Sequence, residues 1–185
     1  MRYLIVCGGK IDKEFGLNEI KTDGIDAIIA ADSGMDFLYE NGVTPDIIVG
    51  DFDSTKTKAL EYFDGRGQTE IHRLNPIKDD TDTEYAIRLA IKHGARSIVV
   101  LGATGSRIDH VLGNISLLGI GLESGTDISI IDTNNRIRMA DRPVTIEKSA
   151  QYGRFVSLIA LTDDNEVSLK GFKYPVTDYS FARFT

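Results

Sequence analysis

The chain has 185 residues, of which 42% are apolar, and its formal net charge is -7. A chain of this length and composition suits one large or two small globular domains with a packed core. Its basic residues are scattered along the sequence, whereas a nucleic-acid-binding surface needs a basic stripe. We therefore expect no nucleic-acid partner.

The single cysteine, Cys7, cannot form a disulfide within the chain, and its apolar surroundings predict a small buried residue. The longest apolar stretch, residues 111–122, falls well short of the ~20 residues that span a bilayer. The N-terminal segment has too short an apolar core for a signal peptide. These features predict a cytoplasmic protein without a membrane segment.

Apolar runs that end in glycine or turn residues alternate with helix-like segments over the first two thirds of the chain. Strands are predicted at residues 3–7, 27–31, 46–49, 69–72 and 97–101. Helices are predicted at residues 35–41, 55–63, 82–93 and 111–122. This alternation is typical of an α/β fold with a doubly wound, mostly parallel, Rossmann-like sheet.

After Gly125 the pattern changes to short alternating runs that turn residues separate, with no helical period. The runs lie at residues 128–130, 137–139, 144–146, 155–161, 167–169 and 179–184. The change of period indicates a second, smaller, all-β domain. The predicted domains are therefore residues 1–124 and residues 125–185.

Two carboxylates, Asp51 and Asp53, come directly after the predicted strand at residues 46–49. Side chains alternate along an extended chain, so both would point to the same side and repel one another. A divalent cation removes this repulsion, and magnesium suits oxygen ligands of this kind. The alternative is a plain loop with an Asx turn.

A second acidic cluster, Asp79, Asp80 and Asp82, follows the next predicted strand. Thr81 and Glu84 have the spacing of a capping box, which predicts a helix that begins at Asp82. The alternative explanation for these acids is that a carboxylate near a helix N-terminus stabilises the helix, by ~0.3–1 kcal/mol each. Because ligands of doubly wound sheets bind where strands end, we predict that both acidic clusters meet around one cation.

A glycine-rich segment, residues 102–110, lies between the strand at residues 97–101 and an apolar helix. Backbone N–H groups of such a loop can donate hydrogen bonds to phosphate oxygens, and the guanidinium of Arg107 can donate two to one phosphate. The spacing is not that of a Walker A loop, and a structural turn stays an alternative. Gly8-Gly9 does not match the dinucleotide fingerprint either, and a plain turn is favoured there.

Taken together, these segments resemble the thiamin pyrophosphokinase family. The matching residues, in the family's order over nearly the whole chain, are Ala31-Asp32-Ser33-Gly34, Pro45-Asp46, Gly50-Asp51-Phe52-Asp53-Ser54, Lys78-Asp79-Asp80-Thr81-Asp82, residues 102–110 and Gly171-Phe172-Lys173-Tyr174-Pro175. Most of these segments are weak signals when taken singly. The Gly-Asp-Phe-Asp-Ser, Asp-Asp-Thr-Asp and Arg-x-Asp-His motifs together are highly specific.

The resemblance implies an α/β catalytic domain followed by a β-sandwich domain that binds thiamine and forms a homodimer, with the active site between subunits. It implies transfer of diphosphate from Mg-ATP to the hydroxyl of thiamine, with release of AMP. The implied magnesium ligands are Asp51, Asp53, Asp82 and Asp109, which form the catalytic set together with Arg107. The implied ATP contacts are Lys78, Thr81, Gly102, Thr104, Ser106 and Arg107. The implied substrate-pocket residues are Asp32, Asp46 and Asp79.

The proton acceptor for the alcohol could be Asp82 or Asp109. Members of the family continue for further strands beyond the Tyr-Pro segment, so the resemblance implies a β domain that is incomplete at its C-terminal end. The alternatives to thiamine phosphorylation are a diphosphokinase for another small alcohol, such as a pterin, and a non-catalytic sensor of Mg-nucleotide.

Overall fold

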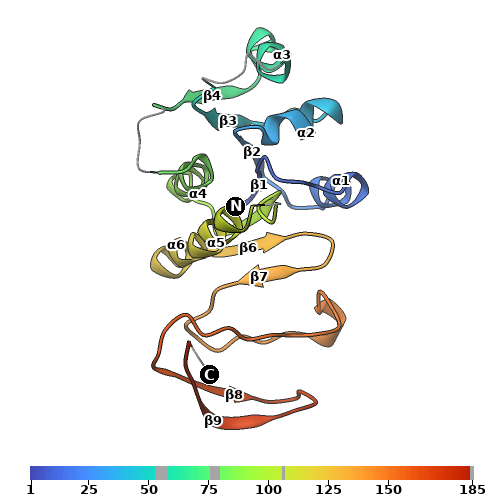
Figure 1. Ribbon diagram of the computed structural model, residues 1–185. Coiled ribbons are helices and arrows are strands. Elements are labelled where there is room, and N and C mark those ends of the chain that lie inside the picture. The colour runs from blue at the N-terminus through green and yellow to red at the C-terminus, as the bar shows by residue number, and fades with distance from the viewer. Residues whose placement is uncertain (53–57, 76–79, 106, 184–185) are drawn as a thin grey trace. The chain divides into compact units, whose positions relative to one another are not determined.

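The computed structural model describes residues 1–52, 58–75, 80–105 and 107–183 (Figure 1). The chain divides into two compact units, Met1–Tyr152 and Gly153–Thr185. No helix in these described ranges is long and apolar enough to cross a membrane, and α4, which is the longest, has 11 residues.

The first unit is built on a seven-stranded sheet in the order β4-β3-β2-β1-β5-β6-β7. The strands are β1 (Arg2–Val6), β2 (Ala27–Ala31), β3 (Ile47–Gly50), β4 (Glu70–Arg73), β5 (Ser97–Leu101), β6 (Asp127–Ile131) and β7 (Arg136–Arg138). The strands β1 to β6 pair in parallel, and β7 pairs antiparallel with β6. The strand order reverses beside β1, so the topological switch point lies between β1 and β5.

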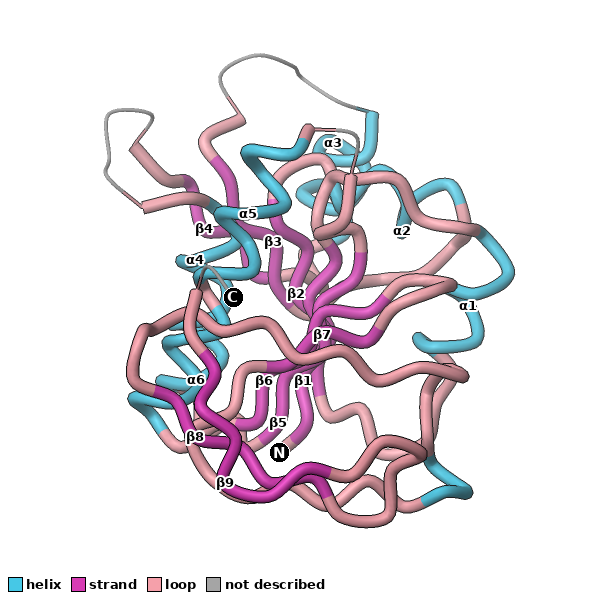
Figure 2. The backbone as a smooth tube through the Cα atoms, turned by 60° about the horizontal axis from the view of Figure 1, so that its bottom comes forward, coloured by secondary structure: helices cyan, strands magenta, loops and turns pink. Residues whose placement is uncertain are grey.

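Helices cover the two faces of this sheet. They are α1 (Lys13–Ile20), α2 (Gly34–Glu40), α3 (Lys58–Arg66), α4 (Asp82–Lys92), α5 (Ile108–Ser116) and α6 (Leu118–Ser124). Figures 1 and 2 show α4, α5 and α6 on one side of the sheet, and α1 and α2 on the other. The sheet is therefore buried on both faces where β1 and its neighbours lie, which explains their continuous apolar sequences.

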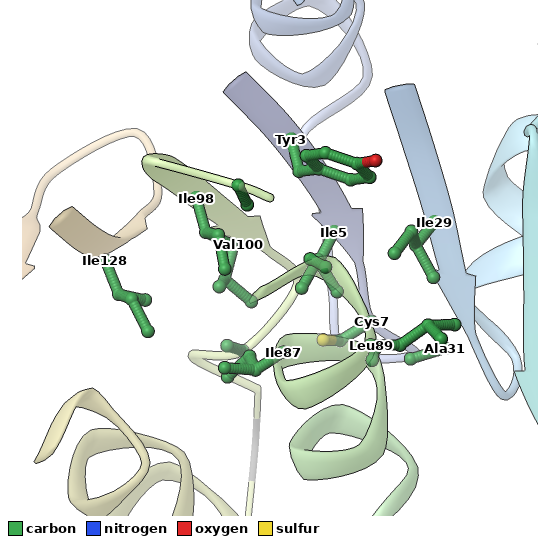
Figure 3. Close-up of a cluster of buried hydrophobic side chains, with 14 of the residues drawn as sticks. Tyr3, Ile5, Cys7, Ile29, Ala31, Ile87, Leu89, Ile98, Val100 and Ile128 are labelled. Carbon is green, nitrogen blue, oxygen red and sulfur yellow. The ribbon is translucent and has the colours of Figure 1, made fainter. Parts of the chain in front are cut away.

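The side chains of β1 show how one strand contributes to two cores. Leu4 and Val6 pack with residues of α2 and α3, whereas Tyr3 and Ile5 face the core that α4 closes. In Figure 3, Ile87 of α4 lies with Ile5 and other labelled strand residues in this second core. The alternation follows from the strand period of two, and it fixes the position of α4 over the middle of the sheet.

The predicted alternation of strands and helices is confirmed, with three local differences. The helix expected at residues 111–122 is two helices, α5 and α6, which meet at Leu117. The helix α3 continues through Gly65 and ends before Gly67, whose φ is 63°. The helix α1 was not predicted, although Asp12 caps it by accepting the N–H of Phe15 at 2.9 Å.

The predicted domain boundary near Gly125 does not coincide with the division between the compact units. The strands β6 and β7 belong to the large sheet, because the apolar run at the end of β6 pairs in parallel with β5 and is buried. The first unit continues through a short 3-10 helix at Lys148–Ala150 to Tyr152. Apolar alternation at residues 128–130 indicated a strand, but did not reveal which sheet it joins.

The second unit contains a small antiparallel sheet of β8 (Asn165–Leu169) and β9 (Val176–Phe181). Both strands overlap predicted runs. The run expected at residues 155–161 is not a strand in the structure, nor is the one at residues 144–146 in the first unit. An alternating sequence alone does not give a strand a partner for its backbone hydrogen bonds, and these two runs have none in a sheet.

Candidate active site at the carboxyl edge of the sheet

The loops that follow the parallel strands all lie at one edge of the sheet. They include Asp32 after β2, Asp51 after β3, and residues 102–105 after β5. Ligands of open α/β sheets bind at this edge, at the point where the strand order reverses. The strand-end residues found in the sequence therefore lie on the functional edge of the fold.

The loops after β1 and β5 contact one another through their backbones. The N–H of Gly9 donates a hydrogen bond of 2.9 Å to the carbonyl of Gly102. A Cβ atom on Gly102 would lie 2.4 Å from the carbonyl oxygen of Cys7, and Gly102 has a φ of 69°. Glycine is thus required at this position for the close approach of two loops.

A cavity of about 320 Å³, the switch-point cavity, lies between the loops that follow β1, β5 and β6. Its lining residues are Lys10, Ile11, Asp12, Phe15, Leu101, Gly102, Thr104, Ile131, Asp132 and Thr133. The volume is at the lower end of the range of about 300–1,000 Å³ for small-molecule sites. Half of the lining residues are charged or polar, so the cavity offers a ligand more polar groups than a mostly apolar small-molecule site does.

Two non-glycine residues adopt left-handed backbone conformations beside this edge. Asp32 has a φ of 51°, and Phe52 has a φ of 53°. The N–H of Asp32 donates to the carbonyl of Val49 at 2.8 Å, so the loop after β2 is fixed to β3. Residues with such backbone conformations cluster at ligand sites, and here one of them, Phe52, directly follows Asp51.

The buried thiol of Cys7 reports which carboxylates lie near the end of β1. Burial raises the pKa of Cys7 to about 11, a hydrogen bond with Thr83 works against this shift, and the charges of Asp32 and Asp82 add to it. Asp32 follows β2, and Asp82 is the first residue of α4. The structure therefore brings Asp82 of the second acidic cluster to the same edge as the residues that follow β1 and β2.

The position of Asp82 follows from the path of α4. The helix connects β4 to β5 and packs against β1, β2 and β3, so that its N-terminus lies at the carboxyl edge. The predicted capping residue is confirmed, because the Thr81 hydroxyl accepts the N–H of Glu84 at 3.1 Å. The side chain of Glu84 does not complete a capping box in this structure and pairs with Arg88 at 2.7 Å.

Arg107 and Asp109 lie together at the start of α5. The guanidinium Nη2 of Arg107 is 2.7 Å from Oδ2 of Asp109, and both side chains are about two-thirds exposed. The hydrogen bond from Arg107 holds the pKa of Asp109 below its ordinary value. The predicted phosphate-binding and metal-binding residues are thus paired with each other in this structure.

Asp46 is at the opposite edge of the sheet. It precedes β3, and its Oδ2 accepts the N–H of Ile28 at 2.8 Å, at the start of β2. A parallel strand of four residues separates Asp46 from the loop that contains Asp51. The expected place of Asp46 in the substrate pocket is therefore not supported, and its contacts indicate a structural role.

Four predicted site residues, Asp53, Lys78, Asp79 and Ser106, lie outside the described residues. Within the described ranges, no three His, Cys, Asp or Glu side chains form a group that could hold a metal ion. The described carboxylates are thus gathered at one edge without forming a closed metal cage.

Sequence reasoning missed Asp132, which lines the cavity and accepts a hydrogen bond of 2.7 Å from Thr104. The signal was the same as for Asp51, since Asp132 directly follows an apolar strand. It was not recognised because β6 had been assigned to the second domain.

Comparison with known proteins agrees with this architecture. The family model described as the catalytic domain of thiamin pyrophosphokinase matches residues 21–130, and its vitamin B1 binding domain matches residues 143–184. The chain is 34% identical over 152 residues to thiamine pyrophosphokinase of Bacillus subtilis (strain 168), which covers 81% of this chain and 70% of that protein.

Solved structures give the same result. The crystal structure of thiamine pyrophosphokinase from Bacillus subtilis matches with a TM-score of 0.86 and 31% identity, over 100% of this chain and 86% of that chain. The enzyme from Geobacillus thermodenitrificans matches with a TM-score of 0.78 and 26% identity, over 99% of this chain and 84% of that chain. The chain therefore belongs to the thiamin pyrophosphokinase family.

Proposed function

We propose that this protein transfers diphosphate from Mg-ATP to the hydroxyl group of thiamine and releases AMP. The observation that supports this most is the position of Asp32, Asp51 and Asp82 at the carboxyl edge of the sheet, where the residues that follow β1, β5 and β6 also line the switch-point cavity. Family membership supports the reaction class, and the geometry supports the place of the reaction.

The donor atoms at this edge fit magnesium. Asp51 and Asp82 offer carboxylate oxygens, which Mg²⁺ prefers, and Mg²⁺ is usually held by one or two carboxylates, waters and substrate phosphates. One or two carboxylates are enough for this mode of binding, because waters and substrate phosphates supply the other ligands. Asp53 and Asp109 are the further carboxylates that the family resemblance assigns to the ion. When bound, the ion would offset the negative charge of the phosphate oxygens.

The loop after β5 would position the nucleotide. Its backbone is fixed against the loop after β1, and the N-terminus of α5 follows it, so N–H groups and the positive helix end face the same edge. Arg107 would move from Asp109 to a phosphate oxygen and stabilise charge that develops during transfer. Rigid placement of the reacting groups supplies much of the rate in phosphoryl transfer.

Asp82 and Asp109 remain the two candidates for accepting the proton of the alcohol. While Arg107 donates to Asp109, the lowered pKa makes that carboxylate a weaker base. A magnesium ion bound to Asp109 would lower the pKa of this carboxyl in the same direction, so Asp109 could accept the proton only while it does not hold the ion.

The acceptor end of the site would involve the second unit. The vitamin B1 binding model covers β8 and β9, which supports thiamine contacts from this part of the chain. The unit also exposes large apolar side chains, among them Phe155 and Ile159. Large exposed apolar side chains are frequent at protein interfaces, and we propose a homodimer in which the two subunits complete one another's thiamine sites.

The test is a single assay with purified protein, MgCl₂, ATP and thiamine, in which AMP and thiamine diphosphate are quantified together. We expect equal amounts of both products and no product when thiamine or magnesium is omitted. AMP formation with a pterin alcohol and not with thiamine would show that thiamine is not the acceptor. Nucleotide binding without AMP from any acceptor would overturn the enzymatic proposal.

A further inference from the structure

The hydroxyl group of Thr104 has a hydrogen-bond partner on the neighbouring loop. Its Oγ1 donates a bond of 2.7 Å to Oδ2 of Asp132, which joins the loops after β5 and β6. Both residues are half-buried and line the switch-point cavity. The hydroxyl has one hydrogen, and this contact uses it.

Asp132 is held in place by several other groups. Its Oδ1 accepts the N–H groups of Asn134 and Asn135 at 2.7 Å each, and the side-chain amide of Asn135 lies 3.0 and 3.1 Å from the two carboxylate oxygens. The hydroxyl of Tyr152 donates to its carbonyl oxygen. Partial burial works to raise the pKa of Asp132, but the hydrogen bonds outweigh it and the pKa is lowered. The carboxylate is therefore ionised at neutral pH and can only accept.

This arrangement sets the polarity of Thr104. Since its proton is directed to Asp132, the oxygen offers only lone pairs to the cavity and cannot donate to a phosphate oxygen. We propose that Asp132 positions Thr104 as a hydrogen-bond acceptor for a donor group of the nucleoside of ATP, either a sugar hydroxyl or the amino group of the base. The phosphate contacts of this segment then come from its backbone N–H groups and from Arg107. The inference rests on the proposed binding of ATP.

The experiment measures binding and not turnover. Isothermal titration calorimetry with magnesium compares ATP, 2′-deoxy-ATP, 3′-deoxy-ATP and ITP on the wild type and on Thr104→Val, which removes the hydroxyl and keeps the shape. On the wild type, the analogue that lacks the donor should bind about three- to tenfold more weakly than ATP. On Thr104→Val this difference should disappear. The analogue that shows the loss identifies the donor as sugar or base.

Two further variants separate positioning from folding. Thr104→Ser keeps the hydroxyl and should retain the difference in affinity between ATP and the analogue that lacks the donor. Asp132→Asn should reduce this difference, because the amide can donate a hydrogen bond to Thr104 and leave the hydroxyl proton free to point elsewhere. Thermal midpoints of all variants check that the loops remain folded. If Thr104→Val weakens all four nucleotides by the same factor, Thr104 meets no nucleoside donor and the inference is wrong. If the wild type binds none of the nucleotides, both the proposed function and the inference about Thr104 are wrong.

Discussion

The N–H of Gly9 donates to the carbonyl of Gly102 at 2.9 Å, which joins the loops after β1 and β5 where the strand order reverses. This contact explains why two glycine-containing loops occur at these strand ends. Each loop leaves room for the backbone of the other, and together they form part of the wall of the switch-point cavity.

Replacing Gly102 should therefore destabilise the protein. In Gly102→Ala, the new Cβ would lie 2.4 Å from the carbonyl of Cys7, in a residue with a φ of 69°. We expect the free energy of unfolding in urea to fall by about 2 kcal/mol or more. The control is Gly65→Ala in α3, where no described atom beyond the neighbouring residues and the helix's own backbone lies within 4 Å of the new Cβ, and a gain of about 0.5–1 kcal/mol is expected. An unchanged urea midpoint for Gly102→Ala would contradict the close approach.

The acidic residues at the carboxyl edge should matter for turnover and not for folding. We expect Asp51→Asn and Asp82→Asn each to lower the rate of AMP release by about 100-fold or more. The thermal midpoint should stay the same or rise, because neighbouring negative charges are removed. Asp64→Asn is the control, since the side chain of Asp64 forms an exposed pair with Arg73 at 3.3 Å. Near-normal turnover in either site variant would remove that residue from the metal site.

Asp46 should behave in the opposite way. Asp46→Ala leaves the N–H of Ile28 without its side-chain acceptor, and we expect a loss of about 1 kcal/mol in the free energy of unfolding. Turnover with thiamine should stay near that of the wild type, because Asp46 lies at the amino edge of the sheet. Asp46→Asn keeps an oxygen acceptor and should be close to the wild type in both measurements. A raised KM for thiamine in Asp46→Ala would return this residue to the substrate pocket.

Arg107 should act mainly in the transition state. We expect Arg107→Ala to lower kcat by about 10- to 100-fold and to raise the KM for ATP much less. Arg107→Lys keeps the charge and loses the fork that Arg107 uses on Asp109, so partial activity is expected. Steady-state kinetics with varied ATP decide the matter. A large rise in KM with unchanged kcat would show that Arg107 contributes only to ground-state binding.

Cys7 should make stability depend on pH above neutrality. Burial raises the pKa of this thiol from 9.0 to about 11, so that between these values the unfolded chain loses the proton and the folded chain keeps it. Stability is then fully present below pH 9 and falls as the pH rises toward 11, by about 1.4 kcal/mol per pH unit at most. Urea unfolding of the wild type and Cys7→Ala at pH 8, 9 and 10 measures the effect.

In that comparison, the packing lost in Cys7→Ala lowers stability by the same amount at every pH. The difference in free energy of unfolding between the wild type and Cys7→Ala should shrink between pH 9 and 10, because only the wild type has this thiol to titrate. Parallel pH curves for the two proteins would mean that the thiol is not buried in solution.

The local pattern of the sequence was sufficient for much of the fold. Continuous apolar runs indicated β1, β2, β3 and β5, because strands covered on both faces have no polar side to show. Thr81 indicated the start of α4, because capping depends only on residues three positions apart. The acids that follow strands indicated the edge at which ligands bind, since that rule depends only on chain direction.

The tertiary structure decided what depends on pairing between distant segments. The short run of β6 could have joined either sheet, and parallel pairing with β5 placed it in the large one. That choice brought Asp132 to Thr104, which lies 28 residues earlier in the chain. Periodicity is a property of neighbouring residues, whereas strand order is selected by packing over the whole domain. The sequence by itself therefore determined the chemical groups and their strand ends, and the fold decided which of them meet.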